Sequence, residues 1–363
     1  MKLIDWYILK RFLVTFLFTL LILIPIAIAI DVSEKIDNFL EHADLGFYQV
    51  VDEYYKNFII YYANTFMPLA VFIAVILFTS KLSNNTEIIA ITNAKVSFTR
   101  FLYPYFVGAT LITIVSLLMN HFVVPSSSKT RKKFEKEYIN SRKQKNELKY
   151  VNDFSLQLTD STYIFIRSFN TQTNSGYDFS SEVYDGLKLK SKLVADNIRF
   201  NKEDSVFTLQ SWRKRQIYKD GDSIFSGNKI DTLFNFTPKD LIYKSALSQE
   251  MPSNELLKFI KVSKKRGVKN LNAYLVEFHK RTSLPIATYI LTIIAVALAF
   301  RKKRGGTGIN LAIGVGTMFI YVFLMKISEV LGAVAGVNSL VYVWLPNFFF
   351  GVIAISLYYY ARK

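Results

Sequence analysis

The sequence predicts a polytopic α-helical membrane protein with three membrane-spanning helices on each side of an inserted soluble β domain. Two observations predict this layout. The apolar residues gather in six runs, each long enough to cross a bilayer, and residues 125–282, between the third and fourth runs, form one polar block. A third observation supports the division: the chain is 51% hydrophobic yet 20% charged, as expected for two regions of opposite composition.

The six predicted spans divide three before and three after the polar block. They are residues 12–30, 58–79, 101–124, 284–300, 308–327 and 340–360. Residues 1–11 mix apolar and charged side chains, which is typical of an interfacial helix that lies along the lipid headgroups. We therefore expect three regions: 1–124 with spans one to three, 125–282 as the inserted domain, and 283–363 with spans four to six.

The orientation in the membrane follows from the basic residues of the short loops, which concentrate on the cytoplasmic side of membrane proteins. With six spans, all the basic loops fall on one side, so both termini are expected in the cytoplasm and the polar block outside. The block's own basic charge does not oppose this, since long domains translocate largely regardless of charge. The basic residues are Lys2, Lys10, Arg11, Lys81, Lys95, Arg100, Arg301, Lys302, Lys303, Arg304, Arg362 and Lys363.

The pattern of the polar block predicts a β domain. Phe154, Leu156 and Leu158 alternate with polar residues, as in a half-buried strand. Asp185-Gly186 and Asp220-Gly221 are turn signals between further strand-like pieces. Several short strands at this spacing predict a sandwich or jelly roll.

Composition favours an anionic partner and argues against chemistry within the chain. The net charge is +17, and residues 125–282 carry 30 Lys and Arg against 18 Asp and Glu. Such a domain suits nucleic acid, phospholipid or a phosphorylated glycolipid. There is no cysteine, the three histidines are scattered, and no P-loop, H-E-x-x-H or G-x-S-x-G motif occurs. We predict no catalytic residue, metal site or cofactor.

The cytoplasmic loop 80–100 carries a predicted short helix at about 84–96. Glu87 falls in its first turn, where the helix dipole favours an anion. Ile88, Ile89 and Ile91 give the helix apolar surface that the bilayer does not obviously cover. Two interpretations stand: an amphipathic helix that rests on the membrane, or a knob that docks into a cytoplasmic partner.

Lys326 and Glu329 lie near the end of the fifth span, where ionisable residues are unusual. One interpretation is an ion pair at the interface. The other is a cation that faces the lumen and binds an anionic ligand. Lys35, at the end of the first span, and Arg281, before the fourth, are expected at the same depth in the membrane.

The order of several motifs around the β insert resembles the LptF/LptG permease family of the lipopolysaccharide-export ABC transporter. The strongest piece is L-x-x-x-x-E-I-I-A-I-x-x-A-K-V-S at 82–97, which is similar to the family's coupling helix. D-N-F-L at 37–40 and the chain length favour the LptG member. The other matching segments are DWYILKRFL at 5–13, the rest of residues 51–104 around the strongest piece, VVP at 123–125, HKRTSLP at 279–285 and VWLPN at 343–347.

The resemblance implies a non-catalytic permease of the bacterial inner membrane with a periplasmic β-jelly-roll domain. Its implied partners are a cytoplasmic LptB-like ATPase dimer, a sibling LptF- or LptG-like permease, a periplasmic bridge protein and a single-span LptC-like subunit. Its substrate is lipopolysaccharide, and no nucleic acid is involved. The implied ATPase-coupling residues are Glu87, Ile88, Ile91 and Ala94.

The resemblance also implies that lipid enters between the first span of one permease and the fifth span of the other. The candidate substrate-binding residues are Lys35, Glu34, Arg281, Tyr321 and Lys326. One departure stands out: a basic residue is expected three positions before Asp37, where this chain has Glu34 with Lys35 beside it. One position rotates a side chain by about 100° around a helix, so Lys35 is expected to point elsewhere.

Two other functions fit the layout. The first is an ABC-type mechanotransmission or signalling subunit that moves no lipid. The second is a membrane lipid transferase, which would need facing carboxylates or histidines at one membrane face.

Overall fold

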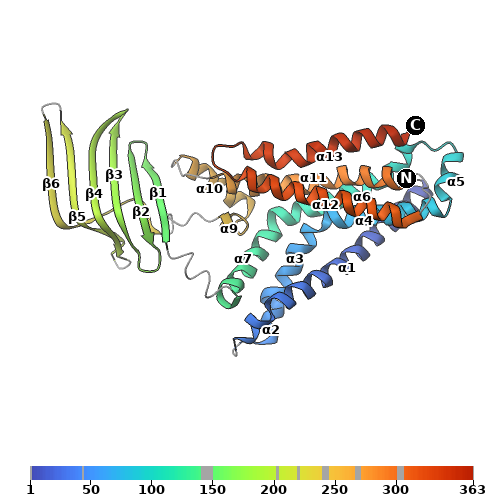
Figure 1. The fold of residues 1–363 in the computed structure, drawn as a ribbon, viewed down its shortest axis with the longest axis horizontal. Coiled ribbons are helices and arrows are strands. Elements are labelled where there is room, and N and C mark those ends of the chain that lie inside the picture. The colour runs from blue at the N-terminus through green and yellow to red at the C-terminus, as the bar shows by residue number, and fades with distance from the viewer. Residues whose placement is uncertain are drawn as a thin grey trace. The chain divides into compact units, whose positions relative to one another are not determined.

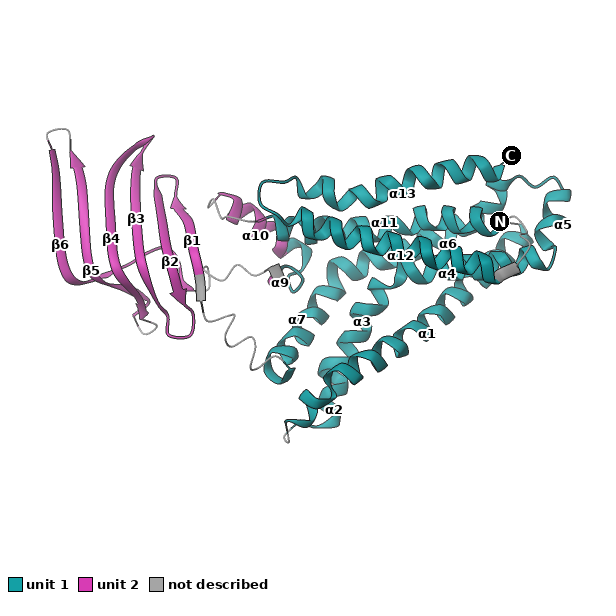
Figure 2. Ribbon diagram, in the orientation of Figure 1, with its two compact units in different colours: residues 1–139, 248–254, 272–363 teal, residues 140–247, 255–271 magenta. Residues whose placement is uncertain are grey.

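The computed structural model describes two compact units (Figures 1 and 2). The first contains residues 1–139, 248–254 and 272–363, and the second contains residues 140–247 and 255–271. The described residues are 2–42, 45–139, 150–201, 204–218, 221–238, 245–265, 271–300 and 306–362.

The first unit is helical and carries every predicted span. Within the described residues, six helical segments are long and apolar enough to cross a membrane, which confirms the six spans. The elements are α1 (Leu3–Leu40), α2 (Phe47–Gln49), η1 (Val50–Tyr55), α3 (Lys56–Thr65), α4 (Met67–Asn84), α5 (Glu87–Asn93), α6 (Phe98–Leu118), η2 (Met119–Val123), α7 (Val124–Phe134), η3 (Glu135–Ile139), α11 (Asn272–Phe300), α12 (Gly306–Gly332) and α13 (Ser339–Arg362).

Helix α1 is longer than the predicted span. The interfacial helix expected at 1–11 is the beginning of α1 itself, since residues 3–40 form one helix. Asp5 is buried and accepts a hydrogen bond from Nη2 of Arg100 at 2.6 Å, which joins the start of α1 to α6. A short charge-assisted bond of this kind holds the first turn of α1 in place against α6.

Helices α4 and α11 form the centre of the first unit. Helix α4 packs against α1, α11 and α12, and α11 packs against α4, α6, α12 and α13. Ala70, Val71 and Phe72 of α4 are fully buried, as are Ala295 and Val296 of α11. Helices α1, α12 and α13 lie at the periphery and keep most of their apolar side chains exposed.

Buried polar groups link α3, α6, η2 and α11 within the apolar interior. Asn64 donates to Oδ1 of Asn120 at 2.7 Å and accepts from Oγ of Ser116 at 2.9 Å. Asn120 donates in turn to the carbonyl oxygen of Arg281 at 3.3 Å. Because buried polar groups need partners, these bonds fix the register of the helices on each other.

The second unit is one antiparallel sheet whose strands follow chain order. Each strand pairs with its neighbours in sequence, from β1 to β6. The predicted Asp185-Gly186 turn joins β3 to β4, with Gly186 at φ 61°. The strands are β1 (Tyr150–Thr159), β2 (Thr162–Asn170), β3 (Ser175–Asp185), β4 (Lys188–Asn201), β5 (Val206–Tyr218) and β6 (Gly221–Thr232).

The inserted β domain is confirmed, but its described strands form a single sheet where we predicted two layers. The apolar residues of five strands gather on one face, and the segment after β6 adds Phe234 and Phe236, which contact Phe207 at ring-centroid distances of 5.8 and 4.5 Å. The sheet therefore covers part of its apolar face with its own returning chain.

A row of residues with positive φ explains how one sheet curves around this core. Asp153, Asp178 and Ser211, on alternate strands, have φ of 49°, 53° and 52°. Side-chain alternation shifts at this row: Ala195 and Ile198 of β4 are both buried, although three positions apart would normally place them on opposite faces. Figure 1 shows that the strands of this sheet are curved.

Helices α9 (Ser245–Ser248) and α10 (Ser253–Lys265) follow the sheet. In α10, Leu256 and Ile260 are buried at i, i+4, as the apolar face predicted there requires. Three of the positions named above lie outside the described residues: the basic loop Arg301–Arg304, Lys363, and Asp220 of the second predicted turn.

Candidate functional site

Helix α5 is the first candidate site, and it is tied to the start of α1. It begins after Thr86, which has φ 62°. The Glu87 carboxylate accepts hydrogen bonds from Nδ2 of Asn85 at 3.2 Å and from the Tyr7 hydroxyl at 3.3 Å. These bonds use both carboxylate oxygens, yet the Glu87 side chain stays only half-buried and within reach of a partner.

The predicted coupling residues divide between two faces of α5. Ile88 is 4% exposed and belongs to the core of the first unit, and Ile91 packs against the same core. Ala94, just after the helix, is exposed. The outward face also includes Ile89 and Ala90, which our sequence reasoning left out of the coupling set. The sequence did contain a sign of this division: residues three apart lie on the same face of a helix, so Ile88 and Ile91 point the same way and Ile89 points elsewhere.

The second candidate site is the C-terminal end of α1, where Lys35 lies in an ion-pair network. Its ammonium is 2.6 Å from Oδ1 of Asp31 and 3.9 Å from Oε1 of Glu135, and it donates to the Tyr54 hydroxyl. Tyr54 is fully buried and also donates to Asp31. Burial and the Asp31 charge raise the pKa of Tyr54 and of Tyr55, so both phenols remain protonated donors.

Arg131 completes this network from α7. Its guanidinium lies 4.3 Å from the centroid of the Tyr61 ring, and its Nε is 3.6 Å from Oε1 of Glu135. Two carboxylates thus face two cations, and the network joins α1 to η1, η3 and α7. Lys35 therefore holds the end of α1, and its charge is balanced within the chain.

Glu34 has the opposite setting. It is exposed and continues a stripe of exposed apolar residues along α1, following Ile26 and Ile30 at intervals of four. The rotation between adjacent positions turns Lys35 inward and Glu34 outward, as we expected from the departure at this position. The outward charge at this end of α1 is therefore negative.

Arg281 is buried, with 3% of its surface exposed, and its donors are occupied within the first unit. Nη2 donates to the carbonyl oxygens of Ser248 and Met251, and Nη1 donates to Oγ of Ser253, each at 2.8 Å. Glu277 lies 3.5 Å from Nε. In this structure Arg281 therefore fastens segment 248–254 to α11 and does not present its charge to a lipid headgroup.

Tyr321 is also buried, and its hydroxyl donates to Oδ1 of Asn347 at 2.9 Å. Asn347 donates to the carbonyl oxygen and to Oγ of Ser283, both at 2.8 Å. These bonds connect α12, α13 and α11 through one buried polar group on each. Tyr321 therefore positions helices in this structure.

Lys326 is the most accessible of the candidate cations. Its side chain is 67% exposed, and its ammonium lies 3.1 Å from Oε2 of Glu329. Glu329 also binds Lys280 of α11 at 2.8 Å. Lys326 projects from a stripe of exposed apolar residues on α12 that includes Phe319 and Phe323.

The structure thus separates the candidates into two surfaces of the first unit. Helix α1 with Glu34 packs against α4 and α6, whereas α12 with Lys326 packs against α4, α11 and α13. Each surface has an exposed apolar stripe that ends in one charged residue. Lys35, Arg281 and Tyr321 lie behind these surfaces, in contacts within the chain.

The sequence matches one known family over almost its whole length. The sequence model described as Lipopolysaccharide export system permease LptF/LptG matches residues 6–360. It covers both members together, so the assignment to LptG stays a prediction. A search of curated proteins finds no match.

Proposed function

The chain belongs to the LptF/LptG family of lipopolysaccharide export permeases, and we propose that it is one of two permease subunits that extract lipopolysaccharide from the inner membrane. The match over residues 6–360 carries this proposal. In it, a separate cytoplasmic ATPase drives transport, and a single-span subunit and a periplasmic bridge protein complete the assembly. The basic residues of the short loops support cytoplasmic termini and a periplasmic β domain.

The proposed contact with the ATPase is the outward face of α5. Ile89 and Ala90 supply apolar surface, and Glu87 supplies a carboxylate at the same end of the helix. Ile88 and Ile91 pack this helix against the core of the permease, which includes α4, so a displacement of α5 would be transmitted to α4. Such rigid seating suits a helix that transmits force.

Glu87→Lys is expected to weaken co-purification of the ATPase at least tenfold while the protein still inserts in the membrane. A charge-assisted bond that becomes buried in the interface contributes about 1.5–3 kcal/mol, and a lysine would replace it with repulsion from any cation that it meets. The measurement is the amount of ATPase retained on the tagged permease.

The matched control is Tyr7→Phe, which removes the bond from Tyr7 to Glu87 and leaves the carboxylate in place. It should retain the ATPase as the unmodified protein does. Full assembly and transport in Glu87→Lys would show that α5 rests on the membrane surface instead.

The proposed path of the lipid runs between the stripe of α12 on one permease and the stripe of α1 on the other. Exposed apolar residues on both helices suit acyl chains, and Lys326 lies at the end of its stripe, where a phosphorylated headgroup would be reached. Of the five candidates, Lys326 and Glu34 are proposed to line this path. Lys35, Arg281 and Tyr321 are proposed to support it.

A photoreactive residue in place of Lys326 is expected to capture lipopolysaccharide in membranes that contain the whole assembly. The control position is Phe348 of α13, which is 76% exposed and lies on a different helix. Capture is measured as a shifted band that reacts with antibody against lipopolysaccharide. Equal capture at both positions would mean that Lys326 meets only bulk lipid.

A further inference from the structure

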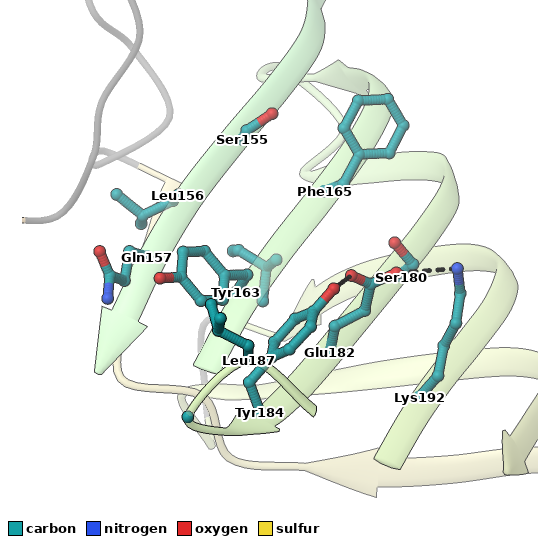
Figure 3. Close-up of a pocket in the computed structure, with 12 residues that line it drawn as sticks. Ser155, Leu156, Gln157, Tyr163, Phe165, Ser180, Glu182, Tyr184, Leu187 and Lys192 are labelled. Carbon is teal, nitrogen blue, oxygen red and sulfur yellow. Dashed lines mark hydrogen bonds and ion pairs between the residues drawn. The ribbon is translucent and has the colours of Figure 1, made fainter. Parts of the chain in front are cut away.

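The sheet carries a cavity beside the turn between β3 and β4. A row of four residues crosses strands β1 to β4 there: Gln157 pairs with Tyr163, Tyr163 with Glu182, and Glu182 with Lys192. Tyr163 alternates with the buried Ile164, so this row points away from the apolar core. Together with neighbouring side chains it lines a cavity of about 640 Å³ (Figure 3).

Two tyrosines form a corner on one side of this cavity. The rings of Tyr163 and Tyr184 are nearly perpendicular, at 87°, with centroids 5.7 Å apart. Leu187 stands in front of them in Figure 3 and is fully exposed. It follows Gly186, whose φ of 61° forms the turn. The tyrosine rings and the leucine side chain provide apolar surface within the cavity.

A charged pair lies beside the tyrosines. The Glu182 carboxylate accepts from the Tyr184 hydroxyl at 2.8 Å and lies 2.8 Å from the Lys192 ammonium. The hydrogen bond from Lys192 lowers the pKa of Glu182, so the carboxylate is ionised at neutral pH. The two charges cancel, yet strong acceptors and donors remain side by side at the cavity wall.

We propose that this cavity binds a neutral pyranose sugar. The C–H face of a sugar ring carries partial positive charge and is attracted to the negative face of a tyrosine ring. Its neighbouring hydroxyls both donate and accept, and Glu182 and Lys192 offer an acceptor and a donor next to each other. The volume is that of a small-ligand pocket with few polar groups.

The other ligand classes fit this lining less well. A phosphate would meet the Glu182 carboxylate, and the nearest cation, Lys192, is already paired with it. An acyl chain would displace water from this ion pair and offer no hydrogen bond in its place, which is costly. The proposal does not depend on the transport role, since the sugar has two possible sources: the headgroup of the transported glycolipid or a separate glycan.

The test uses the full chain in lipid nanodiscs, because detergents with sugar headgroups would compete. Saturation-transfer NMR measures binding of two probes: maltotriose, and the lipid-free core oligosaccharide released from lipopolysaccharide. We expect saturable binding that falls at least tenfold in affinity in Tyr163→Ala and in Tyr184→Ala. Tighter binding of the core oligosaccharide would identify the glycolipid as the source, and equal binding of both probes would indicate a separate glycan.

The matched control is Tyr177→Ala, which removes a half-exposed tyrosine of β3 that does not line the cavity. It should bind both probes as the unmodified chain does, and circular dichroism checks that all three variants keep the sheet. The proposal is overturned by no saturable binding of either probe, by the same loss in Tyr177→Ala, or by displacement with inorganic phosphate.

Discussion

Arg281→Ala is expected to destabilise the helical unit by about 3–5 kcal/mol, the range for breaking a buried charge pair. The variant leaves the carbonyl oxygens of Ser248 and Met251 and the carboxylate of Glu277 without their donor. Each buried acceptor that is left unpaired costs free energy. Arg281→Lys is expected to fail too, because one ammonium cannot reach acceptors that a planar guanidinium spans.

The measurement is the thermal melting temperature of the purified protein, expected to fall by roughly 10 °C. Lys56→Ala is the control: Lys56 is an exposed cation paired with Asp52 in the same unit, and its loss should leave melting nearly unchanged. If Arg281→Ala melts like the unmodified protein, the fastening of segment 248–254 is not important for stability. Arg281 would then again be a candidate for the lipid headgroup.

Gly108→Leu is expected to separate α1 from α6. A Cβ at Gly108 would lie 2.5 Å from Cε1 of Phe12, and the Phe12 ring is fully buried against Tyr105. The ring cannot move aside without displacing that neighbour, and a leucine reaches further than a Cβ. Overpacking of this kind costs about 1–3 kcal/mol, and helices within a membrane associate mainly by close packing.

Gly316→Leu is the matched control, because a Cβ at this exposed position of α12 meets open space. The two variants add the same side chain to a long apolar helix of the unit, α6 in one case and α12 in the other. Size-exclusion profiles and melting temperatures should show loss of a folded peak only for Gly108→Leu. Equal behaviour would mean that the contact between α1 and α6 is adaptable.

Hydropathy was enough to predict the six spans and the inserted domain. A helix that crosses lipid must be long and apolar, and few other structures give such long apolar runs in a sequence. The single sheet was not predictable in the same way. Strict alternation in β1 suggested strands that each keep one face, and nothing in the sequence marks Asp153 or Asp178 as the row where the alternation shifts. Only the pairing of neighbouring strands aligns these residues.

The contacts of the candidate site residues were also only partly predictable, because several of them join residues that are far apart along the chain. The sequence left two interpretations open for Lys326, and it gave Glu34 only as a departure from the family pattern. It could not show that Arg281 meets segment 248–254, because the separation of more than twenty residues includes a change of direction in the chain. Lys35 was in doubt from the sequence, and Tyr54 and Glu135, its partners, are distant from it along the chain.

The chain-order pairing of the sheet has a consequence for the order of folding. Contacts between neighbours in sequence close small loops, so the described strands β1 to β6 need no help from later parts of the chain to pair. The helical unit is different, because α11 packs against α4 and α6 but is synthesised after the whole inserted domain. During synthesis the sheet is therefore expected to form first. Until α11 has been synthesised, α4 and α6 are in the bilayer without the helix that they pack against. This interval is when the unfinished unit would be most exposed to chaperones and proteases of the membrane.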